Sequence, residues 1–331
     1  MEAYLFPEIE ITTACNLQCR HCRVPTTSPD FMSPTLFRRI IENLVKIDIP
    51  YLTLSGGEPL LHPDLFQFLD ISFENDIEQV GIMTNATLLN DKMLNKLEKY
   101  KRYGEVCIGT SIDGFQEIHD WYRNKKGAFS KTLESVKKLV QRDFEVGINV
   151  TIHKKNFHTI HELLDFLSTL NITTIRIRPV LPAGKAENNK DILLNKDELV
   201  NVAHQLKLFI KQNKNKPAIR IVDPVLYTLV YLNGQEPPKN VLNGCTAGVF
   251  QVYIDVYGNI RPCPFLNRNV GNATIQNIEE IANTGIAKKR DQLVGKCGKC
   301  IYKYVCGGCR ARALIYSGNI LGGDPLCPLE I

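Results

Sequence analysis

The chain has 331 residues, 44% of them hydrophobic, which is long enough to bury one large core or one large and one small core. Its formal net charge of +5 is mild, and its lysines lack the clustering and interleaved aromatic residues of a nucleic-acid-binding surface. No stretch approaches the roughly 18 uncharged apolar residues of a membrane span, and the acidic N-terminal segment lacks the basic region of a signal peptide. We therefore predict a cytoplasmic protein with neither a membrane nor a nucleic-acid partner.

Short β-rich runs alternate with amphipathic stretches through the first half of the chain. The predicted strands are 8–13, 51–56, 79–85, 105–113, 145–152 and 173–179. The stretch 34–47 repeats its apolar residues at helical spacing, and Ser33 before Pro34 is a typical helix start. Six such units predict a parallel sheet with right-handed crossovers, but they are too few to close an eight-unit barrel. We predict an α/β fold, an open partial (β/α)6 barrel of the TIM type, with its site at the C-terminal ends of the strands.

The remainder of the chain, from residue 180 onward, no longer shows this alternation of strands and helices. Residues 180–197 are polar and predict a surface loop, and a helix is expected at 196–213. Beyond residue 245, two β-rich runs flank the turn "YGN" and lead into cysteine-rich loops. We therefore divide the chain into a barrel core at 1–180, a bridging helical segment at 181–240 and a small cysteine-rich domain at 241–331.

Eleven cysteines in a chain expected to stay in a reducing compartment indicate metal binding or catalysis and not disulfides. Three of them lie within the first 22 residues, and seven follow residue 244. Cys107 stands alone in the apolar run "VCIG", where we expect a small buried hydrophobic residue.

The first three cysteines form the pattern C-x3-C-x2-C directly after the first predicted strand. Cys15, Cys19 and Cys22 would sit on the loop above the C-terminal end of that strand. Three soft thiolates on one compact loop suit one face of an iron–sulfur cube whose fourth iron stays open. The alternative is a zinc site completed by His21 or by a distant ligand, although zinc usually takes four ligands in paired C-x2-C units.

This cysteine pattern after strand one of a partial barrel resembles that of the radical SAM superfamily. The resemblance implies that the three thiolates hold a [4Fe-4S] cluster whose open iron binds S-adenosylmethionine (SAM). It also implies an enzyme that cleaves SAM reductively to a 5′-deoxyadenosyl radical, which takes a hydrogen atom from a substrate. An external electron donor of the flavodoxin or ferredoxin type is then expected.

Other stretches resemble the superfamily at the ends of the predicted strands. The resemblance places Gly56, Gly57 and Glu58 of "SGGEP" at the methionine amine and Arg123 at the methionine carboxylate. His21 would pack near the adenine. The remaining implied cofactor contacts are Thr84, Asn85, Ser111, Asp113, Asn149 and Thr151. Taken singly, each polar residue is better explained as a turn or helix cap, but their common position above the strand ends favours one site.

The C-terminal cysteines resemble those of the SPASM extension, which binds auxiliary iron–sulfur clusters. The resemblance assigns one complete [4Fe-4S] site to Cys297, Cys300, Cys306 and Cys327. It assigns a second, nearer [4Fe-4S] site, with its fourth position open or filled by another group, to Cys245, Cys263 and Cys309. The spacing departs from the usual pattern at "CGGC", where two residues in place of three precede the last cysteine of the block. Two zinc sites are the alternative.

Three functions remain open from the sequence. The breadth of the SPASM family favours a ribosomally made peptide as substrate, with the auxiliary clusters accepting an electron. A tetrapyrrole is the second substrate, because "KCGKCIYKYVCGGCRARA" and "GCTAG" are similar to enzymes of the alternative haem pathway that oxidatively decarboxylate propionate side chains. Cations for its carboxylates could come from Arg176, Arg178, Arg261, Arg310 and Arg312, unless these pair with surface acids. A non-catalytic iron–sulfur or zinc protein is the third possibility, and it leaves "SGGEP" unexplained.

Overall fold

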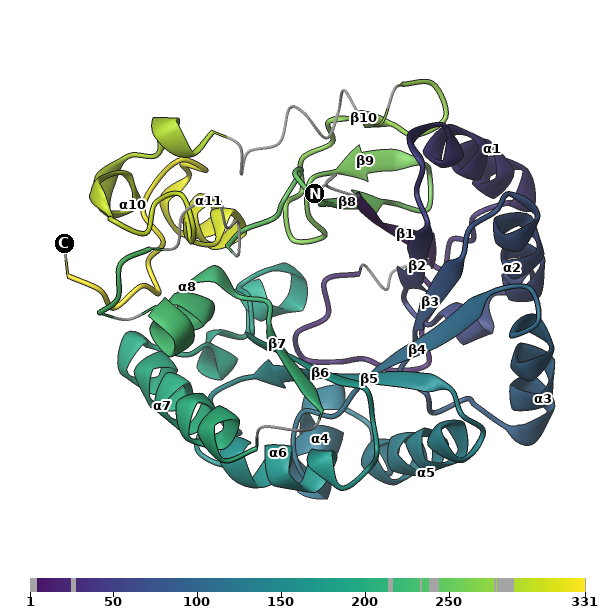
Figure 1. The fold of residues 1–331 in the computed structure, drawn as a ribbon, viewed down its shortest axis with the longest axis horizontal. Helices are drawn as coiled ribbons and strands as arrows, with labels where there is room; N and C mark the ends of the chain where they lie inside the picture. The colour runs from purple at the N-terminus through teal and green to yellow at the C-terminus, as the bar shows by residue number, and fades with distance from the viewer. Residues whose placement is uncertain are drawn as a thin grey trace.

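The computed structural model describes residues 5–24, 28–213, 217–232, 234–237, 244–276, 278 and 289–330. In this part of the chain the strands form one ten-stranded sheet in the order β10-β9-β8-β1-β2-β3-β4-β5-β6-β7. The sheet curves into an open barrel with helices on its outer side, and the C-terminal segment lies beside α8 (Figure 1).

Seven strands run parallel, each paired with its neighbour in chain order. They are β1 (Phe6–Thr12), β2 (Tyr51–Gly56), β3 (Gln79–Met83), β4 (Glu105–Ser111), β5 (Glu145–Ile152), β6 (Thr174–Pro179) and β7 (Ala218–Ile221). Parallel pairing requires a crossover between successive strands, and the intervening helices supply it. The predicted partial α/β barrel is confirmed, and its first six strands lie where the sequence predicts them.

The helices between residues 34 and 212 cover the outer face of the sheet (Figure 1). They are α1 (Pro34–Leu44), α2 (Leu65–Glu74), α3 (Asp91–Tyr100), α4 (Gln116–Arg123), α5 (Ala128–Gln141), α6 (Ile160–Ser168) and α7 (Lys196–Gln212). Ser33 caps α1 by accepting from the backbone N–H of Leu36 (3.2 Å), with Pro34 in the first turn, as predicted. Among the described residues, no helix is both long and apolar enough to cross a lipid bilayer.

Shorter elements complete the fold. Later helices are α8 (Pro224–Tyr227), α10 (Gly295–Lys299) and α11 (Arg310–Ser317). Single 3-10 turns cover Val45–Ile47, Pro59–Leu61, Gly184–Glu187, Lys190–Ile192 and Arg290–Gln292, and a π-helical turn covers Thr228–Leu232.

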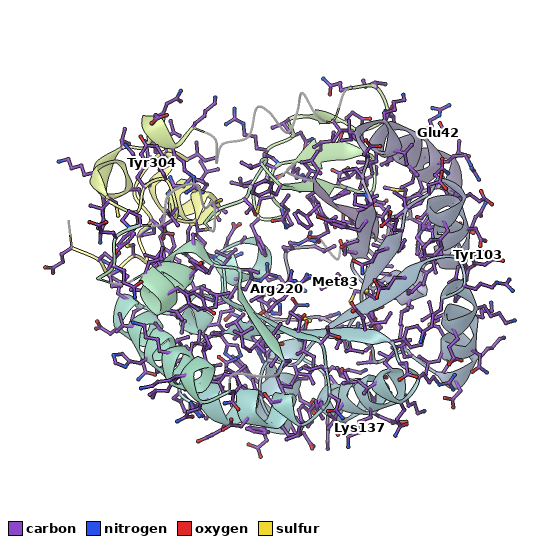
Figure 2. The ribbon with its side chains drawn as sticks, in the orientation of Figure 1. Glu42, Met83, Tyr103, Lys137, Arg220 and Tyr304 are labelled. Carbon is purple, nitrogen blue, oxygen red and sulfur yellow. The ribbon has the colours of Figure 1, made fainter. Side chains whose placement is uncertain are left out.

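The two faces of the sheet differ in chemistry. Alternate residues such as Ile9, Leu54 and Ile148 are fully buried against the helices. The intervening residues line the inner face, where many polar and charged side chains are only partly covered, although Glu10 and Ser55 are buried. Figure 2 shows Met83 and Arg220 on this inner side. The inner face is therefore suited to polar ligands, whereas the outer face forms the apolar core.

Two strands depart from the predicted pattern. β7 falls within 181–240, which the sequence predicts to be helical, because four residues that include Arg220 give too weak a strand signal. β8 (Gln251–Ile254) and β9 (Asn259–Arg261) form the predicted hairpin, but β8 also pairs in parallel with β1. β10 (Gly271–Asn272) adds a short antiparallel strand beside β9. The cysteine-rich segment is thus joined to the barrel through the sheet itself.

Candidate functional site

Cys15, Cys19 and Cys22 lie on the loop between β1 and α1, referred to below as the cysteine loop. The N–H of Cys22 donates to the carbonyl of Cys19 (3.2 Å), and the carbonyl of Cys22 accepts from the N–H of Lys185 (2.9 Å). The N–H of Leu17 donates to Sγ of Cys15 (3.4 Å). Hydrogen bonds of this kind hold the loop in place and favour thiolate sulfur.

Burial makes the thiols of Cys15 and Cys19 weaker acids in the protein alone. It raises the pKa of Cys15 to about 11, and it also raises the pKa of Cys19, where the positive charge of Arg123 opposes the effect. Cys15 and Cys19 therefore stay protonated at neutral pH unless a metal cation displaces the protons. Three thiols on one fixed loop fit an iron–sulfur cluster with one open iron, whereas a structural zinc site needs a fourth ligand.

Gly56 and Gly57 bring the end of β2 into contact with the cysteine loop. The N–H of Gly57 donates to the carbonyl of Thr12, and the N–H of Glu58 donates to that of Ala14, both at 2.7 Å. A Cβ at Gly57 would lie 2.2 Å from the Ala14 oxygen, and one at Gly56, where φ is +135°, would lie 2.1 Å from the Thr12 oxygen. Glycine is therefore required here so that two backbone segments can pack together.

The carboxylate of Glu58 is fully buried and connects β2 to the end of β3. It accepts hydrogen bonds from the hydroxyl of Thr84 (2.6 Å) and from the backbone N–H groups of Asn85 (2.7 Å) and Leu60 (3.1 Å). Burial raises the pKa of Glu58 to about 7, although these donors oppose the shift. The side-chain amide of Asn85 also donates to Asn16 in the cysteine loop (2.8 Å). Glu58, Thr84 and Asn85 thus form one network beside that loop.

Asp113 and Arg123 form a buried ion pair next to Cys19. Nε of Arg123 donates to Oδ2 of Asp113 (2.7 Å), and the N–H of Thr151 donates to Oδ1 (2.9 Å). Nη1 of Arg123 lies 3.9 Å from Sγ of Cys19. Burial alone would raise the pKa of Asp113, but the charge of Arg123 outweighs it and holds the pKa below its usual value. One ion pair therefore connects α4, the end of β4, β5 and the cysteine loop.

The remaining predicted SAM contacts, Ser111 and Asn149, lie in a row of residues that runs across neighbouring strands on the inner face. Ser111 on β4 is paired in register with Asn149 on β5, and Asn149 is paired with Arg176 on β6. Arg176 is paired in turn with Arg220 on β7. The row therefore leads from two predicted SAM contacts to two arginines.

Arg178 lies on β6 two residues beyond Arg176, nearer the C-terminal ends of the strands. It is paired in register with Thr151 on β5. Its guanidinium lies over the ring of Phe265, 4.8 Å from the ring centroid. Burial lowers the pKa of Arg178, while the negative charge of Glu8 acts to raise it. Arg178 thus connects the barrel to the C-terminal cysteine region.

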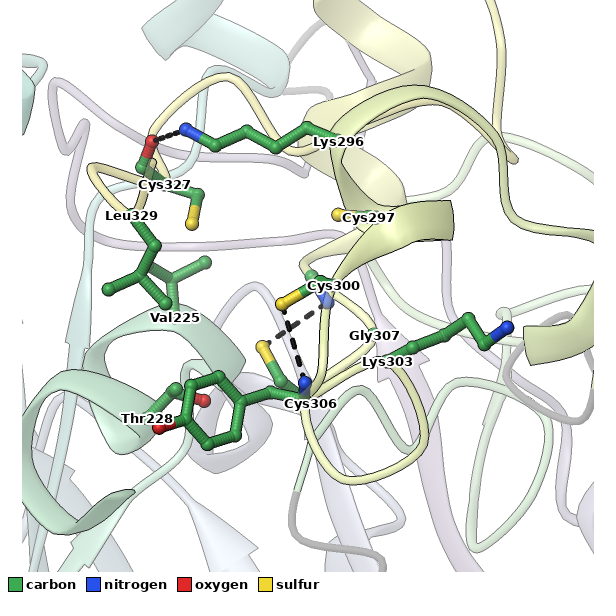
Figure 3. Close-up of a pocket in the computed structure, with 12 residues that line it drawn as sticks. Val225, Thr228, Lys296, Cys297, Cys300, Lys303, Cys306, Gly307, Cys327 and Leu329 are labelled. Atoms are coloured by element: carbon green, nitrogen blue, oxygen red, sulfur yellow. Dashed lines mark hydrogen bonds between the residues drawn. The ribbon is translucent and has the colours of Figure 1, made fainter. Parts of the chain in front are cut away.

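Four of the C-terminal cysteines line one pocket (Figure 3): Cys297, Cys300, Cys306 and Cys327. Their sulfur atoms turn toward a common space (Figure 3). Backbone N–H groups of Tyr302 and Gly308 donate to Sγ of Cys300 and Cys306, both at 3.4 Å. The structure brings together the four residues that the SPASM resemblance assigns to the complete auxiliary site.

Cys245, Cys263 and Cys309 pack in a separate small apolar cluster that includes Leu266. Burial raises the pKa of Cys263 to about 12. The N–H of Cys309 donates to the buried carboxylate of Asp324 (2.7 Å), which fixes the "CGGC" turn despite its unusual spacing. The seven thiols therefore separate into the same groups of four and three that the resemblance implies.

Three further arginines that the sequence suggests as partners of substrate carboxylates already bind groups of the protein itself. Arg261 pairs with Asp255 (3.3 Å), so the predicted alternative of pairing with an acid holds there. Arg312 is fully buried between two aspartates, and Arg310 donates to main-chain carbonyls. These side chains stabilise the cysteine-rich region, which leaves Arg176 and Arg178 from the predicted set.

Cys107 does not have the burial that the sequence predicts. It is half-buried on the inner face of β4, and its thiol donates to the carboxylate of Glu145 (3.3 Å). The predicted burial is wrong because alternate positions of an open barrel strand face inward and not toward the covering helices.

Comparison with known proteins is consistent with this geometry. The sequence model of the radical SAM superfamily matches residues 9–167. The AdoMet-dependent heme synthase of Methanosarcina barkeri is 30% identical over 344 residues, which cover 96% of this chain and 94% of that protein. The chain belongs to the radical SAM superfamily.

A further relative of this radical SAM enzyme is the antilisterial bacteriocin subtilosin biosynthesis protein AlbA of Bacillus subtilis, at 25% identity over 94% of this chain and 68% of that protein. Among solved structures, Streptococcus suis SuiB bound to S-adenosylmethionine aligns with a TM-score of 0.78 at 19% identity, over 98% of this chain and 77% of that chain. The structural similarity shows the fold, and the sequence relatives show the family. The cofactors of this superfamily are a [4Fe-4S] cluster and SAM.

This radical SAM enzyme contains a stack of three rings that the sequence predicts only in part. His21 stacks on Tyr122, and Tyr122 stacks on His153, with ring centroids 4.2 and 4.0 Å apart. Burial lowers the pKa of His21 to about 3 and that of His153 to about 4, so both rings are neutral at physiological pH. Only His21 carries a sequence signal, because the packing of α4 against the end of β5 has no local pattern.

Arg23 is a second residue that sequence reasoning misses. It follows Cys22 and donates to Glu8 on β1 (3.1 Å) and to the hydroxyl of Tyr253 on β8 (2.8 Å). Tyr253 donates in turn to the buried carboxylate of Glu10. The cysteine loop is thus fixed to the C-terminal hairpin through one guanidinium.

Proposed function

We propose that this radical SAM enzyme oxidises propionate side chains of a tetrapyrrole. The observation that carries the proposal is the position of Arg178, which approaches both the cysteine loop and the C-terminal cysteines. Its guanidinium lies over Phe265, two residues after Cys263. Arg178 is also in register with Thr151, whose N–H donates to Asp113, the partner of Arg123 beside Cys19. A substrate held at Arg178 would have a source of radicals on one side and an electron acceptor on the other.

The choice of substrate rests on the comparisons and on charge. The M. barkeri relative, which matches almost the whole of both chains, is named a heme synthase. The sequence alone favours a peptide, but the arginines on the inner face of β6 and β7 suit a substrate with several carboxylates. The resemblance of the C-terminal region to alternative haem-pathway enzymes supports the same substrate class.

We assign Cys15, Cys19 and Cys22 as the ligands of the first cluster, which with bound SAM supplies a 5′-deoxyadenosyl radical. Around it, Glu58 and Asp113 fix the ends of β2 to β5 by their buried hydrogen bonds. Arg123 offers positive charge to the methionine carboxylate while Asp113 keeps its guanidinium oriented. The other assigned SAM contacts are Gly56, Gly57, Thr84, Asn85, Ser111, Asn149 and Thr151.

The C-terminal cysteines are assigned to two auxiliary [4Fe-4S] clusters. The pocket of Cys297, Cys300, Cys306 and Cys327 would hold one completely. Cys245, Cys263 and Cys309 would hold the nearer one, with one iron lacking a cysteine. The domain division at about 180 and 240 is retained in this proposal, with β7 added to the bridging segment and β8 paired with the barrel.

The proposed reaction balances as follows. A radical formed from SAM would remove one hydrogen atom from the propionate carbon that is attached to the ring. Breakage of the carbon–carboxylate bond would then release carbon dioxide and one electron and leave a vinyl group, and a cluster held by Cys245, Cys263 and Cys309 would accept that electron. The flavodoxin or ferredoxin type donor supplies the electron that SAM cleavage consumes.

Incubation with iron coproporphyrin III tests the proposal. Protein purified without oxygen is mixed with SAM, dithionite and this tetrapropionate, and the products are analysed by mass spectrometry. We expect 5′-deoxyadenosine together with a porphyrin that has lost the elements of formic acid from a side chain. Formation of 5′-deoxyadenosine without any change in the porphyrin would refute the tetrapyrrole assignment.

Maturation of a ribosomal peptide is the second candidate, and the similarity to AlbA favours it. Its test is incubation of the same preparation with any short peptide encoded beside the gene. A SAM-dependent mass change in that peptide, with coproporphyrin left unchanged, would establish the second candidate instead.

A further inference from the structure

We propose that Arg176, Arg178 and Arg220 form a carboxylate-binding site for the substrate, an assignment that rests on the proposed function. These three residues are called the arginine row below. They come from the inner face of two adjacent strands, β6 and β7, at the edge of the parallel barrel.

The first argument is their placement. Arg176 and Arg220 are directly paired across β6 and β7, so their Cα atoms are about 5 Å apart. Arg178 is two residues beyond Arg176, which places it on the same face about 7 Å further along the strand. Asn149, an assigned SAM contact, is the next residue in register beyond Arg176. A substrate on the arginine row would therefore lie beside the assigned SAM site.

The second argument is their charge. Like charges directly opposite one another on neighbouring strands are destabilising. Among the residues that the structure describes, no carboxylate oxygen lies within 4.0 Å of a guanidinium nitrogen in the arginine row. Arg176 and Arg220 keep exposed side chains inside the open barrel, and partial desolvation there together with the positive charge of Arg220 lowers the pKa of Arg176. The protein therefore maintains a concentration of positive charge that its own nearby acids do not neutralise.

Glu8 is the carboxylate whose negative charge reaches Arg176 and Arg178 most strongly. Its oxygen Oε1 is already held by Arg23 (3.1 Å) and by the hydroxyl of Ser55 (2.9 Å). Glu8 is therefore committed to the cysteine loop and leaves the arginine row to a ligand.

The third argument is the geometry of Arg178. The guanidinium carbon of Arg178 lies 4.8 Å from the centroid of the Phe265 ring, and this contact restricts where the side chain can lie. A guanidinium fixed in this way can donate two parallel hydrogen bonds to a carboxylate. Two more guanidinium groups along the row suit further carboxylates of the same molecule, which favours a polycarboxylate over a ligand with a single charge.

Binding of metal-free coproporphyrin III, followed by the shift of its absorbance, tests the inference without any turnover. The variants are Arg176→Gln, Arg178→Gln and Arg220→Gln, each in the cluster-containing protein, with Arg178→Lys as a variant that keeps the charge. Coproporphyrin tetramethyl ester has the same ring without carboxylates. Arg38→Gln, at an exposed pair with Glu74 on the outer helices, removes the same charge far from the row.

We expect each Gln variant to weaken coproporphyrin binding about 10- to 100-fold, because each loses a charge-assisted hydrogen bond. Arg178→Lys should retain part of the affinity, Arg38→Gln should match the wild type, and the ester should bind weakly to every protein. Iron content and unfolding midpoint show that each variant is folded.

Affinity within twofold of wild type in all three folded Gln variants would overturn the inference, as would equal binding of acid and ester. Absence of coproporphyrin binding to the wild type would overturn it as well. Release of 5′-deoxyadenosine by the wild type separates these outcomes from failure of the radical SAM chemistry itself.

Discussion

Arg123 lies between Asp113 and Cys19, with its Nε 2.7 Å from Oδ2 of the aspartate and its Nη1 3.9 Å from the cysteine sulfur. The aspartate is fully buried, and its carboxylate accepts hydrogen bonds from this arginine and from the backbone N–H of Thr151. A single side chain thus connects a buried acid in the barrel to a thiol of the cysteine loop.

Asp113→Asn should destabilise the protein by about 3–5 kcal/mol, because it leaves the guanidinium of Arg123 buried without its counter-ion. Urea unfolding under anaerobic conditions measures the loss. Glu74→Gln is the control, since it breaks an exposed pair with Arg38 and should change stability by less than about 1 kcal/mol. Equal effects of the two substitutions would show that the Asp113–Arg123 pair is not a structural connection.

Gly57→Ala should reduce the iron bound at the cysteine loop, because the added Cβ would meet the backbone oxygen of Ala14 at 2.2 Å. Backbone atoms cannot move aside as a flexible side chain can, so we also expect about 1–3 kcal/mol of destabilisation. Gly147→Ala is the matched control, since its nearest neighbour would lie at 3.9 Å. Full iron content in Gly57→Ala would mean that the loop does not need this close packing.

The iron content of cysteine-to-serine variants should show which thiols bind iron. Three clusters correspond to about twelve iron atoms per chain, and we expect Cys15→Ser, Cys300→Ser or Cys309→Ser each to lose about four. Cys107→Ser should lose none, because its thiol contacts Glu145 instead of other thiols. Zinc in place of iron, or an iron loss in Cys107→Ser, would contradict the assignment.

Replacing Cys245, Cys263 and Cys309 together with alanine should leave SAM cleavage intact and abolish the oxidised product. The reason is that the proposed reaction needs an acceptor for one electron after hydrogen abstraction. Parallel assays of 5′-deoxyadenosine and porphyrin product measure the two steps, and undiminished product would refute the role of this cluster.

His153 should make stability depend on pH. Its pKa is lowered from 6.5 to about 4 in the folded state, mainly by burial, so the unfolded state binds the proton more readily. The stabilisation is complete above pH 6.5 and is lost as the pH falls toward 4, by about 3 kcal/mol. In His153→Phe, which keeps an aromatic ring on Tyr122, unfolding measured from pH 7 to 4.5 should lose less stability than in wild type. Identical pH profiles would contradict this explanation.

The sequence predicts the barrel well because the signals are local. Strands 51–56 and 145–152 match β2 and β5 residue for residue, and Ser33 caps α1 as its position indicates. What the sequence does not predict depends on distant pairing. The parallel contact of β8 with β1 joins residues more than two hundred positions apart, and β7 is too short to show an apolar alternation.

The residues of the candidate site also divide into those that the sequence predicts and those that depend on contacts between distant segments. The grouping of the C-terminal thiols follows from resemblance, since spacing alone does not show that Cys327 joins Cys297 at one pocket. Glu58 and Gly57 are predicted as ligand contacts, whereas the structure gives them hydrogen bonds to neighbouring backbone. Tyr122 and Arg23 have no motif of their own, because their partners come from distant segments of the chain.

The parallel pairing of Phe6–Ile9 with Gln251–Ile254 joins the strand that leads to Cys15 to the hairpin that leads to Cys263. In the proposed reaction an electron would pass between the groups held at these two places. Separating them would require breaking the backbone hydrogen bonds of β1, β8 and β9, so motions of the outer helices should leave the distance of that transfer nearly unchanged.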